Sequence, residues 1–301
     1  MSNVAKVLKT IKDKEVKFVD LRFTDTKGKW QHTAQTSSTI DANTFKDGIM
    51  FDGSSIAGWK NINESDMILM PDPSTAVLDP FTAQPQLILF CDVIEPSDGK
   101  PYELDPRSTG KKAEAYLKSS GIGEKCFFGP EAEFFIFDDV KWSTDQEYTF
   151  FSIDSEEGAY NTGTEMEGGN MGHRPKDKGG YFPVPPVDSA TDIRAEMVST
   201  MNEMGIEMEK HHHEVAPSQH ELGFKFGSLI QSADNLQKYK YCVHMVAQAY
   251  GKTATFMPKP VYNDNGSGMH VHQSIWSKNS SLFAGKGYAG VSDTCLYYIG
   301  G

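Results

Sequence analysis

Three short stretches, far apart along the chain, place carboxylates and imidazoles among turn residues and residues typical of strands. They are residues 129–133, 212–221 and 263–272. Successive side chains of a strand point to opposite sides, so residues two positions apart share a face. We therefore expect the fold to bring the polar faces of all three stretches together. The pattern predicts one site for divalent metal, and so many oxygen ligands indicate a protein that handles phosphates.

The first stretch puts Glu131 and Glu133 on one face of a strand. Two carboxylates on one face repel each other unless a cation or water separates them. The neighbouring Phe128, Phe134 and Phe135 imply burial, which makes an unpaired charge costly. An edge strand with solvated glutamates is the alternative. The aromatic neighbours favour metal ligands or a catalytic pair.

The second stretch contains His212 and Glu214, which share a face if the chain is extended. Pro217 and Ser218 then turn the chain, and Glu221 returns a carboxylate toward the same region. A polar surface loop is the alternative. Mg²⁺ and Mn²⁺ accept carboxylates with an occasional imidazole, whereas a zinc site would require more nitrogen or sulfur ligands.

The third stretch is a turn rich in Asn, Asp and Gly that leads into a strand with His270 and His272 on one face. Glycines in such a turn permit close approach of the backbone to a ligand. An ordinary turn before a strand is the alternative. On its own this motif is weak, because Asn-Gly turns are common.

Composition limits the class of protein. The chain has 301 residues, 4 cysteines and a formal net charge of -12. No stretch is basic enough to predict nucleic-acid binding, although a bound divalent cation would still allow a phosphorylated substrate. The cysteines are widely spaced, which fits a reducing compartment. The N-terminus lacks an apolar signal segment, and no apolar run is long enough to span a bilayer. We expect a soluble cytoplasmic protein with no nucleic-acid or membrane partner.

Breaker residues at 96–101 predict a boundary between a strand-rich region, 1–100, and a region of alternating helices and strands, 101–301. The predicted fold class is α+β, with a curved, largely antiparallel sheet, helices outside it, and the site on the concave face. The expected elements are helices at 1–15, from Ser108 to near Gly121, at 189–209 with Ser189 in a capping box, and at about 234–250; strands at 16–23, from Trp30, at 86–91 and at 131–137; and a polar loop at 145–180.

In the first region, residues 52–59 form a Gly/Ser-containing loop that would serve as a hairpin loop or as a lid over a neighbouring site. A phosphate-binding loop is not favoured, because such loops usually lead into a helix N-terminus and no clear helix follows here.

Residues 51–59, 63–72, 129–138, 178–188, 211–221 and 259–274 together resemble the bacterial class I glutamine synthetases, in order along the whole chain. The resemblance implies an N-terminal β-grasp domain and a catalytic domain. It also implies ATP-dependent joining of ammonium to L-glutamate through a γ-glutamyl phosphate, with Mg²⁺ or Mn²⁺ neutralising charge on the transferred phosphoryl group.

The resemblance also implies roles for individual residues. Glu133, Glu214 and Glu221 would bind the first metal ion, and Glu131 and His270 the second. Asp52 and Ser55 would act at the active site of an adjacent subunit in a homododecamer, where Asp52 binds ammonium and takes its proton. Asn265 and Gly266 match the glutamate-binding turn. By the same resemblance, ATP or its phosphates would be contacted by Glu209, His212, Phe226 and Ser274.

Members of that family continue well beyond position 301, with a flap, substrate-binding arginines and a third ligand of the second metal ion. The resemblance therefore implies that the first metal site is complete in these 301 residues and that the second is not, so the chain alone should have little activity. Two alternatives remain open at this point. One is a γ-glutamyl ligase for another amine, and the other is a non-catalytic assembly or regulatory module.

Overall fold

The computed structural model describes residues 1–165, 169 and 172–301. The described chain forms two compact units. The first contains Met1–Cys126, Ser228–Asp234 and Ser274–Gly301, and the second contains Phe127–Gly227 and Asn235–Gln273. No helix among the described residues is long and apolar enough to cross a membrane, and the four cysteines are free.

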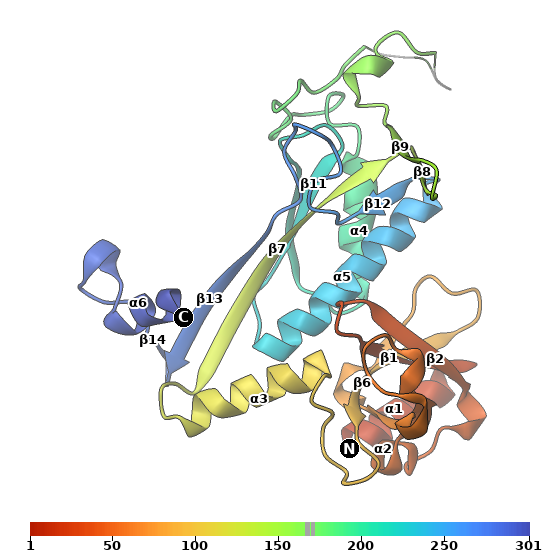
Figure 1. The fold of residues 1–301 in the computed structure, drawn as a ribbon, viewed down its shortest axis with the longest axis vertical. Coiled ribbons are helices and arrows are strands. Elements are labelled where there is room, and N and C mark those ends of the chain that lie inside the picture. Colours follow the sequence, from red (N-terminus) through yellow and green to blue (C-terminus); the bar gives the residue numbers. More distant parts are fainter. Residues whose placement is uncertain (166–168, 170–171) are drawn as a thin grey trace. The chain divides into compact units, whose positions relative to one another are not determined.

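The first unit is built around a sheet with strand order β2-β1-β6-β4-β3, to which β5 adds beside β6 (Figure 1). β1 and β6 run parallel, and the other pairs run antiparallel. The predicted hairpin is confirmed, since β1 and β2 pair along their whole length. The strands are β1 (Phe18–Thr24), β2 (Trp30–Thr36), β3 (Ile49–Asp52), β4 (Asp66–Pro71), β5 (Val77–Leu78) and β6 (Gln86–Ile94).

One apolar core supports this sheet. Leu21, Leu69 and Leu89 are fully buried on three of its strands, and Val7 packs on them from helix α1 (Asn3–Asp13). Burial of each such side chain stabilises the fold by about 1.5–3 kcal/mol. The short helix α2 (Thr44–Asp47) precedes β3.

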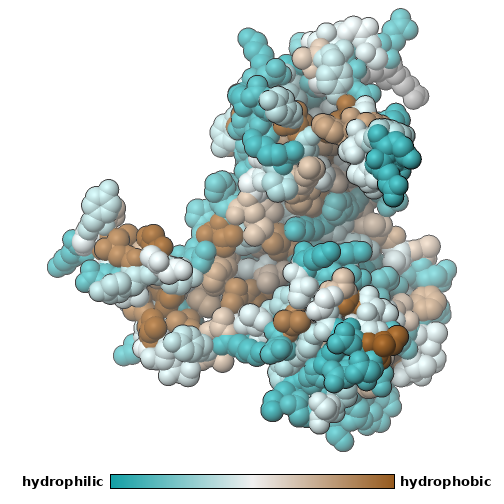
Figure 2. Space-filling view, in the orientation of Figure 1, coloured by the Kyte–Doolittle hydropathy of each residue, from teal (hydrophilic) through white to brown (hydrophobic). Residues whose placement is uncertain are grey.

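Two further helices belong to the first unit. Helix α3 (Pro106–Ser119) begins two residues earlier than predicted, because the Asp105 carboxylate accepts the backbone N–H groups of Arg107 and Ser108 and so caps the helix. Helix α6 (Asp293–Gly300) exposes Leu296 and Ile299. Figure 2 shows hydrophobic residues gathered around α6.

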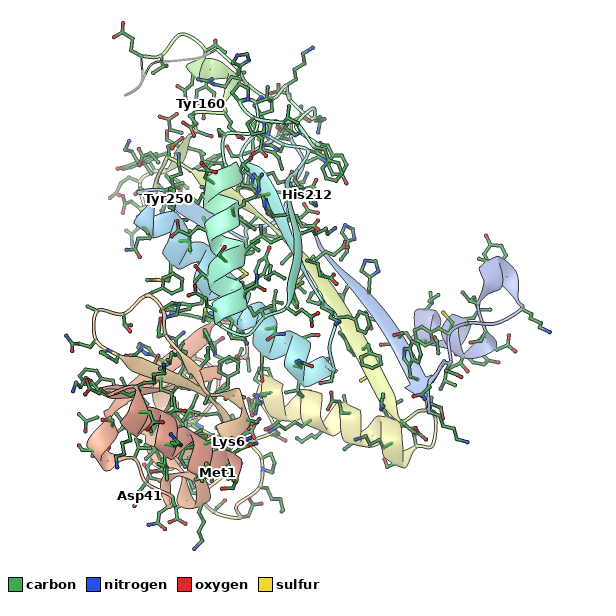
Figure 3. All side chains as sticks on the ribbon, turned by 180° about the vertical axis from the view of Figure 1, so that it is seen from behind. Met1, Lys6, Asp41, Tyr160, His212 and Tyr250 are labelled. Carbon is green, nitrogen blue, oxygen red and sulfur yellow. The ribbon has the colours of Figure 1, made fainter. Side chains whose placement is uncertain are left out.

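The second unit contains most of a sheet with strand order β10-β11-β7-β13-β14, in which β12 also pairs with β7. The pairs β10/β11, β11/β7 and β12/β7 are antiparallel, as predicted. Helices α4 and α5 lie on the same side of this sheet (Figures 1 and 3). The elements are β7 (Lys125–Phe137), β10 (Met208–His213), β11 (Gln219–Phe224), β12 (Thr253–Thr255), β13 (Met269–Ser277), β14 (Ser280–Ser281), α4 (Thr191–Glu203) and α5 (Leu229–Ala249).

The predicted boundaries of two further helices are wrong. The helix expected at 189–209 ends at Glu203, because Gly205 takes a left-handed conformation (φ +78°) and Ile206 N–H closes the helix end on Met201 O. Its predicted cap also fails, since Ser189 makes no capping bond and donates its hydroxyl to Glu157. The helix expected from 234 begins at Leu229.

The predicted loop at 145–180 is partly wrong. Residues Thr149–Asp154 form β9, which pairs in register with β8 (Asp139–Thr144) as an antiparallel hairpin. Trp142 and Phe151 face each other across this hairpin, and both are exposed. Part of the segment, 166–168 and 170–171, lies outside the described residues.

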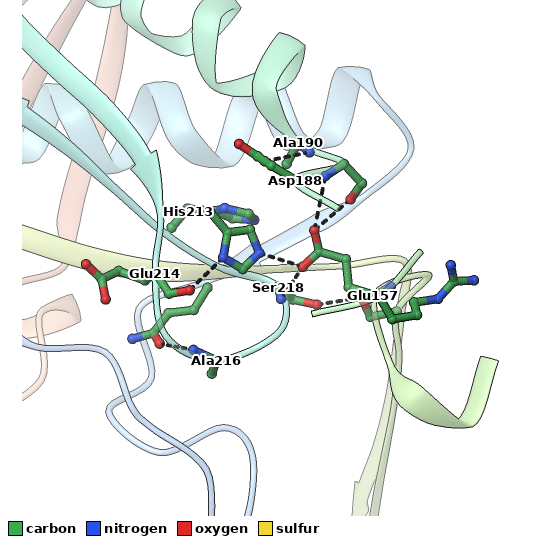
Figure 4. Close-up of polar contacts among 12 residues, drawn as sticks. Glu157, Asp188, Ala190, His213, Glu214, Ala216 and Ser218 are labelled. Carbon is green, nitrogen blue, oxygen red and sulfur yellow. Dashed lines mark hydrogen bonds and ion pairs between the residues drawn. The ribbon is translucent and has the colours of Figure 1, made fainter. Parts of the chain in front are cut away.

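The same segment supplies Glu157, whose buried carboxylate contacts the turn between β10 and β11 (Figure 4). Its oxygens accept hydrogen bonds from His213 Nε2 (2.8 Å), Ser218 N (2.5 Å) and Ser189 Oγ (2.7 Å). His213 Nδ1 also faces an acceptor, the carbonyl of Glu214, at 2.6 Å. Because both ring nitrogens face acceptors, the imidazole must carry two protons. A buried ion pair therefore holds the turn.

This ion pair makes stability depend on pH. Although burial opposes the charged form, the contacts with His213 lower the pKa of Glu157 to about 2, and the pKa of His213 is raised. The contribution of Glu157 is thus fully present above its unfolded pKa of 4.5 and is lost as pH falls toward 2. The contribution of His213 is present below 6.5 and is lost as pH rises through its raised pKa.

We predict that Glu157→Gln lowers the free energy of unfolding by about 3 kcal/mol near pH 6. The deficit should shrink toward zero near pH 2, where the wild-type carboxylate also becomes protonated. Urea unfolding at both pH values, with chelator present, measures it. A deficit that stays constant between pH 6 and pH 2 would contradict this role for the carboxylate.

Candidate metal and phosphate site

The pairing register places three side chains in a row across neighbouring strands. His212 of β10 lies opposite Glu221 of β11, and Glu221 lies opposite Glu133 of β7. Directly paired residues of antiparallel strands have Cβ atoms about 4.5–5.5 Å apart and share a face. The register therefore brings together side chains that are distant in sequence, as the sequence patterns predicted.

This row lies on the side of the sheet opposite α4 and α5. The neighbouring side chains identify the helix side, because Phe134 packs against Tyr239 of α5 and His220 Nδ1 contacts Arg194 of α4 at 3.0 Å. Since side chains alternate along each strand, Glu133 and Glu221 point to the other side. Tyr239 fixes the sheet further by donating its hydroxyl to Ala132 O at 2.7 Å.

Three potential ligands converge at one end of the row. One ligand atom each from His212, Glu214 and Glu221 lie within 4.8 Å of one another, and both carboxylates are buried. Glu221 Oε1 is buried and makes no hydrogen bond of good geometry, and its nearest cationic neighbours are Lys210 Nζ at 3.3 Å and His212 Nε2 at 3.6 Å. Two buried carboxylates and an imidazole with this oxygen are a donor set that fits a divalent cation such as Mg²⁺ or Mn²⁺.

The pKa values reflect this crowding of negative charge. Burial, together with the charges of Glu133 and Glu221, raises the pKa of Glu214. The imidazole of His212, and then Lys210, lower the pKa of Glu221 against the effect of burial. Desolvation opposes the charged form of His212, but its contacts with Glu221 dominate and raise its pKa. A cation would relieve the repulsion among the three carboxylates.

Several residues of this site were missed by sequence reasoning. Lys210 Nζ lies 3.3 Å from Glu221 Oε1 and is a protein cation beside the cluster. Tyr181 and Phe182 pack their rings against His212, with centroids 5.8 and 4.8 Å away. His212, which the resemblance assigns to contacts with ATP, also lies within reach of the candidate metal ligands Glu214 and Glu221, and its contact with ATP stays a prediction. Tyr181 and Phe182 lie in the stretch 178–188 that resembles the family, but no role was assigned to either, and Lys210 lies outside every stretch that the sequence singled out.

Glu131 lies further along β7 and pairs with His272, whose Nε2 is 3.1 Å from Glu131 Oε1. His270 lies near Glu133, because a Cβ built on Gly268 would meet both Glu133 Oε1, at 2.9 Å, and His270 Nε2, at 3.3 Å. Gly268 thus leaves space that any side chain would fill. The assignment of Glu131 and His270 to a second metal ion stays a prediction.

The predicted glutamate-binding turn packs tightly beside Glu133. A Cβ on Gly266 would lie 2.1 Å from the carbonyl oxygen of Pro258, so only glycine fits there. Lys259 Nζ donates to Asp264 O at 2.8 Å, and Asp264 Oδ1 accepts the N–H of Asn265. These bonds give the turn a defined shape without a ligand.

The other predicted residues are placed as follows. Glu209 is the extra residue of a bulge in β10 and is exposed. Phe226 is largely exposed and contacts the ring of Phe127. Ser274 lies on β13, where its hydroxyl accepts a hydrogen bond from Trp276 Nε1. Their contacts with ATP stay predictions.

In the first unit, Asp52 is the last residue of β3, and Ser55 ends the 3-10 turn that follows it. The Asp52 carboxylate accepts hydrogen bonds from Ser54 N and from the hydroxyls of Ser54 and Ser55, which lower its pKa. Asp52 is therefore an exposed carboxylate held charged in a defined orientation. Such a group suits a small cation, but its action on ammonium stays a prediction.

Known proteins resemble this chain in sequence and in fold. Residues 15–96 match the family described as the glutamine synthetase beta-grasp domain, and residues 103–301 match the glutamine synthetase catalytic domain. The whole chain is 63% identical to a glutamine synthetase of Azospirillum brasilense and 62% identical to one of Rhizobium meliloti. A relative from Cupriavidus pinatubonensis, 58% identical over 300 residues, is named 3-hydroxylaminophenol mutase.

A solved glutamine synthetase from Plasmodium falciparum has the same fold, with a TM-score of 0.90 at 31% identity over 99% of this chain and 59% of that one. The chain spans 64% of the length of the first two curated relatives. The two matched domains cover most of its residues in order. The chain belongs to the glutamine synthetase family.

Proposed function

We propose that the protein is an ATP-dependent glutamate–ammonia ligase. It would phosphorylate the γ-carboxylate of L-glutamate and let ammonia displace the phosphate to form glutamine. The observation that carries this proposal is the row of His212, Glu221 and Glu133, joined by Glu214, on one face of the sheet. Phosphoryl transfer needs dense positive charge, and a ligand set this acidic supplies it by holding divalent cations.

Different residues of the chain would bind the metal ions, ATP, the amino acid and ammonium. Glu133, Glu214 and Glu221 would hold the first ion and Glu131 and His270 the second, and an ion held there would neutralise the charge that develops on the phosphoryl group. His212, Glu209, Phe226 and Ser274 would contact ATP. The turn at Asn265 and Gly266 would orient the amino acid. The protein would form a ring-shaped homododecamer that acts in the cytoplasm. Asp52 and Ser55 of one subunit would reach the active site of the next, where Asp52 would bind ammonium and take its proton.

The same assays test two alternative functions. A γ-glutamyl ligase for a larger amine would share the metal ligands but would not need the short carboxylate of Asp52, which suits a small cation. A non-catalytic assembly module would not need buried carboxylates that converge, and the buried Glu214 and Glu221 disfavour it.

The first prediction concerns the metal. The 301-residue chain should bind Mn²⁺ in an isothermal titration, and Glu221→Gln should weaken binding by more than the roughly 10- to 100-fold typical of lost outer partners. Glu207→Gln is the matched control, because Glu207 is exposed and pairs with Lys225. Absence of Mn²⁺ binding by the unmodified chain would favour the assembly module.

The second prediction concerns the amine. In a protein of the relatives' full length that carries these residues, Asp52→Asn should reduce ammonium-dependent phosphate release from ATP and glutamate by about 100-fold. Asp98→Asn, at an exposed ion pair with Lys100, should leave the rate unchanged. Faster turnover with a larger amine than with ammonium would replace this function with the other ligase.

A further inference from the structure

Gln219 makes more specific contacts than a buried side chain needs for packing. It is the first residue of β11 and is 1% exposed. Its amide nitrogen Nε2 donates to Glu133 Oε2 at 2.6 Å and to the carbonyl oxygen of Gly266 at 2.8 Å. Its amide oxygen Oε1 accepts the N–H of Ala216 at 3.0 Å. Both donors and the acceptor of the amide are therefore used, in three directions.

The two acceptors of Nε2 belong to different parts of the site. Glu133 is a candidate metal ligand on β7, whereas Gly266 belongs to the turn assigned to the amino acid. The contact with Gly266 runs to a backbone carbonyl, so it fixes the path of the turn itself. A backbone bond from Glu133 N to Gly268 O (3.0 Å) lies nearby, but the Gln219 amide is the side-chain link between the carboxylate and Gly266.

The bond to Glu133 also distinguishes the two oxygens of its carboxylate. Oε2 is occupied by the amide, whereas Oε1 lies beside Gly268 and His270 Nε2. A bond of 2.6 Å to a charged acceptor is strong and orients the carboxylate. Partners of this kind raise metal affinity by holding a ligand in one orientation.

We propose that Gln219 is a positioning residue that couples metal binding at Glu133 to the order of the Asn265–Gly266 turn. This inference rests on the proposed function, because it takes Glu133 as a metal ligand and the turn as the amino-acid site. Gln219 itself touches neither the ion nor the substrate. Cation binding that fixes Glu133 also fixes, through one amide group, the carbonyl of Gly266.

The chemistry of the side chain makes the role specific. Methionine has a similar length but cannot donate, so Gln219→Met removes all three bonds. Glutamate has the same shape and keeps the acceptor for Ala216 N–H, but it replaces the two donors with a carboxylate beside Glu133. Comparison of the two variants separates the coupling from simple support of the β10–β11 turn.

The test is hydrogen exchange of residues 258–268 in the 301-residue chain, with and without saturating Mn²⁺. In the unmodified chain, Mn²⁺ should slow exchange in this segment. In both Gln219→Met and Gln219→Glu, saturating Mn²⁺ should leave its exchange unchanged, and in Gln219→Met the Mn²⁺ affinity should fall roughly 10- to 100-fold. Gln248→Met, an exposed change on α5, is the control.

The outcomes are distinguishable. If the unmodified chain binds no Mn²⁺, the proposed function fails. If it binds Mn²⁺ and the segment is protected equally in the Gln219 variants, the coupling is wrong. Should the variants unfold, the unmodified chain still decides: the side-chain amide resonances of Gln219 should shift with the Gly266 backbone signal during a Mg²⁺ titration, and amide resonances that stay fixed would overturn the proposal.

Discussion

The pairing register of β11 between β10 and β7 is the constraint on which the candidate site depends. It sets His212, Glu221 and Glu133 side by side, and it turns Phe134 and His220 toward the helices. A slip of one residue would exchange these two sets, because the side-chain period of a strand is two. The polar face and the core face thus specify each other: Phe134 packs on Tyr239 only when Glu133 points away from the helices.

The turn between β10 and β11 is held on both sides, and this support explains how acidic ligands can crowd together. On the side of the turn toward which His213 points, the Glu157 carboxylate accepts hydrogen bonds from the His213 imidazole and from the N–H of Ser218. On the side of the candidate metal ligands, the amide of Gln219 donates hydrogen bonds to Glu133 and to the carbonyl oxygen of Gly266. Repulsion among carboxylates would otherwise splay the turn. The neighbouring groups hold the ligands in place before an ion arrives, and such preorganisation reduces the cost of binding.

Much of the site could be predicted from the sequence, because period-two spacing and aromatic neighbours are local signals. These signals predicted that Glu131 and Glu133 share one face of a strand and that the chain turns back to bring Glu221 toward the same region. The supporting residues could not be predicted. Glu157 and Gln219 act across 56 and 86 positions, on His213 and Glu133 respectively. Gln219 lies inside the stretch 212–221, but no local pattern indicates the distant partner of either residue. The end of α4 was also missed, although Gly205 is a typical helix-ending residue. The apolar residues continue from α4 into β10, so their pattern predicted one longer helix.

The central claim is that this register builds a site for a divalent cation. Anomalous X-ray diffraction from crystals of the chain grown with Mn²⁺ tests it most directly. The account predicts a manganese peak within coordination distance of the side chains of Glu214 and Glu221, about 2.0–2.3 Å from their oxygens. Crystals that contain Mn²⁺ at other positions, with this cluster in its present geometry and no peak beside Glu221, would contradict it.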